Sequence, residues 1–166
     1  IVLGGTQAFD GADTLLGGDG RDLLWGNYGA DSIVGNAGDD LIVPNHAEFG
    51  AQLPAAVFAI QGEWLSTRTF AERQANIAGT GAGPRANGSF FLQAGTTVID
   101  DNAADTMTGG ADSDWFVAPG PTDVITDPDP PPGFARLGAS SGEALGAESL
   151  AAPGGVLGIR TATDIS

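Results

Sequence analysis

Hydrophobic positions in residues 8–43 recur every nine residues, in four consecutive units. The units read AFDGADTLL, GGDGRDLLW, GNYGADSIV and GNAGDDLIV. The eighth position of each unit is aliphatic and holds Leu15, Leu24, Ile33 and Ile42. We expect this residue to lie in a short strand and to point inward, so that the repeat predicts one strand per unit.

Two further columns of the repeat suggest a metal site. The fourth position is always glycine (Gly11, Gly20, Gly29 and Gly38), and the sixth is always aspartate (Asp13, Asp22, Asp31 and Asp40). Glycine tolerates a positive φ, so it permits a tight turn and lets backbone carbonyl groups approach a shared point. Aspartate supplies a hard oxygen ligand at that point.

These units resemble the nonapeptide G-G-x-G-x-D-x-U-x of RTX (hemolysin-type calcium-binding) proteins. The resemblance implies a mainly β fold, a calcium-binding parallel β-roll (a β-solenoid) in which two nonapeptides make one coil. It implies Ca²⁺ ions between stacked turns, with Asp13 paired with Asp31 and Asp22 with Asp40. Because each repeat buries few apolar side chains, we expect calcium binding to be coupled to folding.

The nine-residue phase returns at residue 100, in the units DDNAADTMT, GGADSDWFV and APGPTDVIT. Their sixth column holds Asp105, Asp114 and Asp123, and their eighth holds Met107, Phe116 and Ile125, with Val98 one unit earlier. The glycine column is lost, because Ala103, Asp112 and Pro121 occupy it. We interpret residues 91–126 as degenerate repeats that continue or cap the roll. Asp105 and Asp123 are candidates to share a calcium ion, although Pro121 disfavours that site.

Residues 44–90 break the nine-residue pattern and predict a short helical insert followed by a loop. Pro54 favours a helix start, and one helical face would carry Val57, Ile60, Trp64 and Leu65. Thr69 and Glu72 form a possible capping box for a second helix, which Gly79 would end. Residues 63–116 also resemble a module found near the ends of RTX-repeat regions in large bacterial surface and secreted proteins, and this resemblance brings no enzymatic role.

The net charge of −15 comes from 21 acidic residues against 6 basic ones. Seven of these acids occupy the sixth column of the repeat, a fixed phase that a disordered acidic tract has no reason to keep. The charge argues against nucleic acid and anionic membranes as partners. There is no cysteine, so calcium would take the place of disulfides in a secreted protein. No apolar run is long enough for membrane insertion as a helix.

Several residues outside the columns have simpler expected roles. Asp10, Asp19, Asp39 and Asp112 are expected to be solvated or to lie beside the ligands, and Trp25 and Tyr28 to lie on the surface. The GASSG sequence at 138–142 sits in a low-complexity tail, which is a poor context for a nucleophile elbow. The single histidine, His46, belongs to no zinc motif and is expected at the surface. We therefore assign no catalytic residue and expect no enzymatic activity.

The chain is thus divided into an RTX roll (1–43), a helical insert and loop (44–90), degenerate repeats (91–126), and a Pro-rich linker with a Pro/Gly/Ala-rich tail (127–166). The expected function is that of an extracellular, calcium-stabilised structural or adhesive module of a bacterial secreted or cell-surface protein. Val2 falls in the inward column, so the chain reads as starting in mid-repeat. It would then be a fragment, or copies would assemble head to tail into a fibre. The alternative is a C-terminal domain for type I secretion and folding of an exoenzyme, a metalloprotease or lipase.

Overall fold

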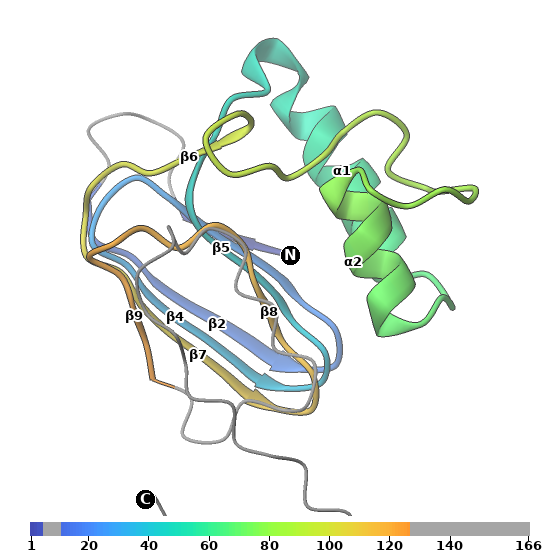
Figure 1. Cartoon of the computed structure of the whole chain (residues 1–166). Helices are drawn as coiled ribbons and strands as arrows, with labels where there is room; N and C mark the ends of the chain where they lie inside the picture. The colour runs from blue at the N-terminus through green and yellow to red at the C-terminus, as the bar shows by residue number, and fades with distance from the viewer. Residues whose placement is uncertain (5–10, 127–166) are drawn as a thin grey trace, which may run out of the picture.

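The computed structural model describes residues 1–4 and 11–126, so the tail expected at 127–166 lies outside the described residues. The chain alternates between two sheets whose paired strands run mostly parallel (Figure 1). Sheet A contains β1 (Val2–Leu3), β3 (Leu23–Asn27), β5 (Leu41–Ala47) and β8 (Trp115–Phe116). Sheet B contains β2 (Thr14–Asp19), β4 (Ser32–Ala37), β7 (Thr106–Ala111) and β9 (Val124–Ile125).

Neighbouring strands of each sheet keep the register of the repeat. Leu15 pairs with Ile33 in sheet B, and Leu24 pairs with Ile42 in sheet A. The paired turns are 18 residues apart, which is two nonapeptides. The prediction that units n and n+2 stack is therefore confirmed, and we call each pair of consecutive units one coil.

The second block of repeats continues the same two sheets. β4 pairs in parallel with β7 (Ser32 with Thr106), and β5 with β8 (Leu41 with Trp115). The sequence separation across these pairs is 74 residues instead of 18. The chain therefore leaves the stack after β5 and returns to it in the next coil, with the repeat register unchanged.

The eighth column of the repeat forms the core between the two sheets. Leu15, Leu24, Ile33, Ile42, Met107 and Phe116 make one buried cluster, against which Val2 and Ile125 pack. This confirms the inward column in both blocks. The assignment of Val98 to the column is wrong, because Val98 lies in the short strand β6 (Val98–Ile99). That strand runs antiparallel to β5, and Val98 joins a different cluster.

The segment between β5 and β6 contains the predicted helices. A 3₁₀ turn, Gly50–Gln52, leads into α1 (Leu53–Trp64), which has a proline in its first turn. The capping box between Thr69 and Glu72 starts α2 (Phe70–Ala78). Gly79 ends α2 at a φ of 82°, which suits glycine. Leu65 was wrongly placed on the buried face, because it follows the last residue of α1 and is 49 % exposed.

The helical segment (Gly50–Ala78) covers the outer face of sheet A and creates a second core. Figure 1 shows both helices on the side of sheet A. Ala56, Val57, Ile60, Trp64 and Ile77 pack there against Leu23, Trp25, Leu41, Val43, Trp115 and Val117. The expectation that Trp25 lies on the surface is wrong, because the nine-residue period contains no information about a helix that covers it. Within residues 1–4 and 11–126, neither helix is long and apolar enough to cross a membrane.

Candidate metal centre

The sixth-column aspartates form two ladders, one along each edge of the stacked sheets. In every pair, the backbone N–H of one aspartate donates to Oδ1 of the aspartate one coil further on. The donor–acceptor distances are 2.8 Å for Asp13–Asp31 and Asp22–Asp40, 2.7 Å for Asp31–Asp105, 2.9 Å for Asp40–Asp114 and 3.1 Å for Asp105–Asp123. We call the ladder of Asp22, Asp40 and Asp114 the Asp40 edge. The ladder of Asp13, Asp31, Asp105 and Asp123 is the Asp31 edge.

The second carboxylate oxygen of two of these aspartates has no hydrogen-bond partner. Oδ2 of Asp40 and Oδ2 of Asp105 are both buried without one, in side chains that are 0 % and 1 % exposed. An unsatisfied buried carboxylate oxygen is costly unless a cation or a donor compensates it. One such oxygen on each edge therefore requires a cation or a donor beside it, and a bound metal ion fits that requirement.

Glycines in the first column of the repeat open the space that Oδ2 of Asp40 faces. A Cβ atom added at Gly35 would collide with Oδ2 of Asp40 and would lie 2.6 Å from the carbonyl oxygen of Gly109. A Cβ at Gly17 would lie 2.6 Å from the carbonyl oxygen of Gly35 and 3.0 Å from Oδ2 of Asp22. Carboxylate and carbonyl oxygens of adjacent coils thus face one narrow space that is open only because the residue beside it is glycine.

The role of the first-column glycines beside the carboxylates was not predicted from the sequence. The signal was present, because the first column reads Gly17, Gly26 and Gly35 in three consecutive units and Gly109 in the second block. The same arrangement holds at Gly26, where a Cβ would meet Oδ2 of Asp31 and the carbonyl oxygen of Pro44.

The fourth-column glycines shape the turns themselves. Gly20, Gly29 and Gly38 have φ values of 99°, 109° and 111°, a region that side chains with a Cβ rarely adopt. They also permit close stacking, because a Cβ at Gly29 would lie 2.5 Å from the carbonyl oxygen of Gly11. The predicted glycines therefore bring turn backbones together, while the first-column glycines leave room beside the carboxylates.

Asp123 differs from the other sixth-column residues. Its Oδ1 accepts from the N–H of Asp105, and its Oδ2 accepts a 2.6 Å hydrogen bond from the N–H of Gly120. Both oxygens are therefore satisfied by backbone donors, on the turn that carries Pro121. The structure brings Asp105 and Asp123 together as predicted, and a calcium ion shared by them stays a prediction.

Burial strongly perturbs the ionisation of the ladder. Burial raises the pKa of Asp40 to about 7, and the negative charges of Asp114, Asp22 and Asp39 add to the rise, while the hydrogen bond from the Asp22 N–H opposes it. Burial likewise raises the pKa of Asp105 to about 7, with Asp123, Asp31 and Asp101 adding to it. The pKa of Asp123 is also raised, mainly by burial. The ionised ladder thus lacks compensating positive charge.

The donor set restricts the kind of ion that fits. Among the side chains in residues 1–4 and 11–126, no three His, Cys, Asp or Glu residues converge as a metal-binding group. An ion would therefore be held by aspartate oxygens together with backbone carbonyl oxygens. Such an all-oxygen set, which includes neutral carbonyl groups, is the type that Ca²⁺ prefers.

A comparison with protein-family models places this ladder in a known class. The model described as the RTX calcium-binding nonapeptide repeat matches residues 7–42 and 96–118, in four copies. These segments contain most strands of the two sheets, so the chain carries RTX repeats and the identification from sequence is confirmed. Searches of curated proteins and of solved structures gave no match. RTX repeats indicate a calcium-binding module of the kind found in secreted bacterial proteins.

Proposed function

We propose that the two sheets form a calcium-binding β-roll and that the chain is a structural module of a bacterial secreted or cell-surface protein. The observation that carries this proposal is the pair of buried, unpartnered oxygens Oδ2 of Asp40 and Oδ2 of Asp105, of which the Asp40 oxygen shares its space with the Gly109 carbonyl oxygen of the next coil. In this function, calcium completes the fold outside the cell, where the ion is abundant.

The aspartates and glycines of the two edges have separate tasks in this proposal. Bound calcium supplies positive charge between carboxylates that otherwise repel one another. Asp22, Asp40 and Asp114 would hold ions on one edge, and Asp13, Asp31 and Asp105 on the other. The first-column glycines keep the space beside the carboxylates free of side chains. Because the ligands come from successive coils, each ion would fasten one coil to the next and so couple binding to folding.

We further propose that the chain has no catalytic activity of its own. Buried polar side chains of the helical segment and of β5 support this, because contacts within the fold hold them. Glu63 accepts hydrogen bonds from Asn76 Nδ2 at 2.7 Å and from the Ala86 N–H at 2.6 Å. His46 stacks on Tyr28 with ring centroids 4.4 Å apart and pairs with Glu48. His46 is 9 % exposed, so the expectation of a surface histidine is wrong.

The alternative function is a secretion and folding domain for an exoenzyme whose catalytic part lies elsewhere in the same protein. Both functions use the same calcium ladder, so the metal site does not separate them. The coding sequence upstream of Ile1 does: a protease or lipase domain would support the alternative, while further repeats would support the structural module.

The test uses the full 166-residue chain and circular dichroism. In excess chelator we expect mostly coil, and millimolar Ca²⁺ should restore β signal while Mg²⁺ should not. Asp40→Asn should raise the calcium concentration at the midpoint by about tenfold or more, because ligand charge tunes calcium affinity. Asp19→Asn removes the same charge from an exposed position and should leave the midpoint unchanged. A wild-type spectrum that does not respond to calcium, in protein shown to be metal-free, would overturn the proposal.

A further inference from the structure

The two edges differ in the fifth column, directly before the sixth-column aspartates. On the Asp31 edge this column holds Ala12, Ala30, Ala104 and Thr122, whereas on the Asp40 edge it holds Arg21, Asp39 and Ser113. An alanine has no polar side-chain group, while each fifth-column residue of the Asp40 edge does. The two edges therefore differ in sequence at this column, and the contacts of Asp39 show a structural consequence.

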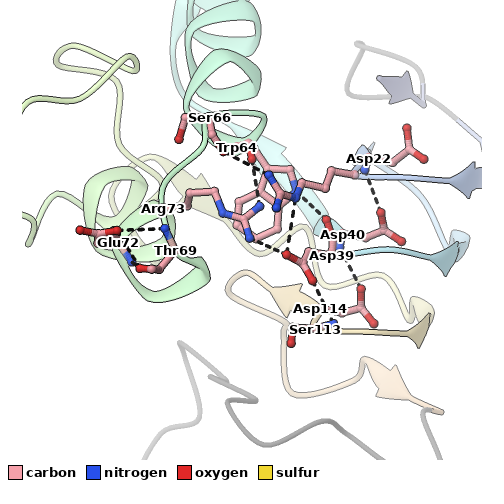
Figure 2. A network of polar contacts seen from close by, with 11 residues as sticks. Asp22, Asp39, Asp40, Trp64, Ser66, Thr69, Glu72, Arg73, Ser113 and Asp114 are labelled. Atoms are coloured by element: carbon pink, nitrogen blue, oxygen red, sulfur yellow. Dashed lines mark hydrogen bonds and ion pairs between the residues drawn. The ribbon is translucent and has the colours of Figure 1, made fainter.

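Asp39 is the centre of a polar network between the Asp40 edge and the helical segment (Figure 2). Its Oδ2 accepts from Nη2 of Arg73, and Nε of Arg21 lies 3.5 Å from the same oxygen. Its Oδ1 accepts from the N–H of Ser113 at 3.3 Å, and its carbonyl oxygen accepts from the indole N–H of Trp64 at 2.9 Å. Asp39 thus connects three successive coils to the helices and lies beside the ligand column, the second of the two positions expected for it.

Arg73 is held firmly from the side of the helices. It is 1 % exposed, its Nη1 donates to the carbonyl oxygen of Trp64 at 3.0 Å, and its guanidinium lies 4.6 Å from the centroid of the Trp64 ring. Trp64 in turn packs against Trp115 of the next coil, with 6.1 Å between ring centroids. A buried arginine with this many contacts fixes the place of the carboxylate that it binds.

Asp39 directly precedes Asp40, so a constraint on Asp39 is a constraint on the turn that presents Asp40. We propose that Arg73 is a positioning residue for calcium: by binding Asp39 it preorganises the turns of the Asp40 edge and so raises their calcium affinity. The Asp31 edge has alanine at three of its four fifth-column positions, and its turn at Gly29 donates instead to Oδ2 of Asp101 at 2.8 Å. This inference rests on the proposed calcium-binding function and adds that Arg73 raises the calcium affinity of one edge only.

Arg73 would raise calcium affinity by ordering the turn before the ion binds. A turn that is already ordered loses less conformational entropy when it binds an ion, so more of the interaction remains as affinity. Groups that orient metal ligands without touching the metal typically change affinity by about 10–100-fold when they are removed. Arg73 would act in this way from another segment of the chain, 34 residues away in sequence from Asp39.

The experiment follows turn glycines by nuclear magnetic resonance in a calcium titration of the full chain. Amide signals of Gly20 and Gly38 report on the Asp40 edge, and that of Gly29 reports on the Asp31 edge. In Arg73→Gln, the midpoint for Gly20 and Gly38 should rise about tenfold or more, while that for Gly29 should stay within about twofold. Arg85→Gln is the matched control, because it removes the same charge from a residue that stacks on Phe91 and contacts neither edge.

A second variant covers the case in which Arg73→Gln does not fold. Trp64→Phe keeps a smaller aromatic ring under the helices and removes the N–H that donates to the Asp39 carbonyl group, and it should raise the Asp40-edge midpoint alone. Equal shifts at both edges in the variants would overturn the inference, as would no shift at either edge. If the wild-type signals show no calcium response at all, the proposed function itself fails, which is a separate result.

Discussion

The outer faces of the two sheets use the same columns of the same repeat, yet one is buried and the other is bare. On sheet A the seventh and ninth columns are apolar and lie under the helical segment: Leu23, Trp25, Leu41, Val43, Trp115 and Val117. On sheet B the same columns are mostly hydroxyl-bearing and none is buried: Thr14, Leu16, Ser32, Val34, Thr106, Thr108, Val124 and Thr126. The eighth column is apolar on both sheets.

The helical segment therefore gives sheet A a source of stability that does not come from the repeat. Strands buried on both faces become almost continuously apolar, as in β3 and β5, whose first three residues are all buried. Sheet B has one apolar face, so under the proposed function it would depend on the inner core and on calcium at its turns.

Without calcium, the two edges that carry the aspartate ladders should be more stable in mild acid than at alkaline pH. The folded-state pKa values of Asp40 and Asp105 are raised to about 7, above the unfolded value. Their contribution is therefore fully present below about pH 4 and is lost as the pH rises through 7, by on the order of 4 kcal/mol for each group. Circular dichroism in chelator, followed from pH 4 to pH 8, measures the change as the folded fraction at each pH.

The corresponding control is the double variant Asp40→Asn/Asp105→Asn, which should flatten this pH dependence. With saturating calcium the trend should reverse, because protons compete with the ion for the same carboxylate oxygens. A metal-free chain that becomes more stable between pH 5.5 and pH 8 would contradict the assigned burial of these two groups.

Truncating one ninth-column side chain on each face should separate the faces directly. Trp25→Ala should lower the free energy of unfolding by about 3–5 kcal/mol, because it empties a fully buried site under the helices. Leu16→Ala changes the same column on sheet B, where Leu16 is 59 % exposed, and should cost about 0.5 kcal/mol or less. Both are measured by urea unfolding in excess calcium, and equal losses would show that the outer face of sheet A is not a core.

The smallest expected effect comes from the cap of α2. Thr69→Ala removes the hydroxyl group that accepts from the Glu72 N–H and donates to the Glu72 carboxylate, while the backbone N–H of residue 69 remains, and it should lower stability by about 1 kcal/mol. Thr106→Ala is a matched change on the bare face and should stay within about 0.5 kcal/mol. Thermal unfolding in calcium compares the two, and a larger loss at Thr106 would mean that sheet B is the more tightly packed face.

The features that could be predicted from the sequence are those that repeat or that have a local signal. The eighth column gave the inner core, and the offset of two units gave the strand register. The helix caps at Thr69 and Gly79 were also predictable, because their signals are local. The burial of Trp25 was not, since it depends on contact with helices far along the chain. The ion pair between Arg73 and Asp39 likewise joins an ordinary helical arginine to an acid outside the ligand column.

Hydrogen exchange of backbone amides, with calcium and with chelator, tests whether calcium completes the fold, because exchange reports local stability strand by strand. With calcium, β2, β4 and β7 of sheet B and β3 and β5 of sheet A should all be protected. In chelator, protection of sheet B should fall to nearly that of unfolded chain, while β3, β5 and α1 should keep a larger residual protection. Unchanged protection of sheet B after complete removal of calcium would contradict a fold that the ion completes.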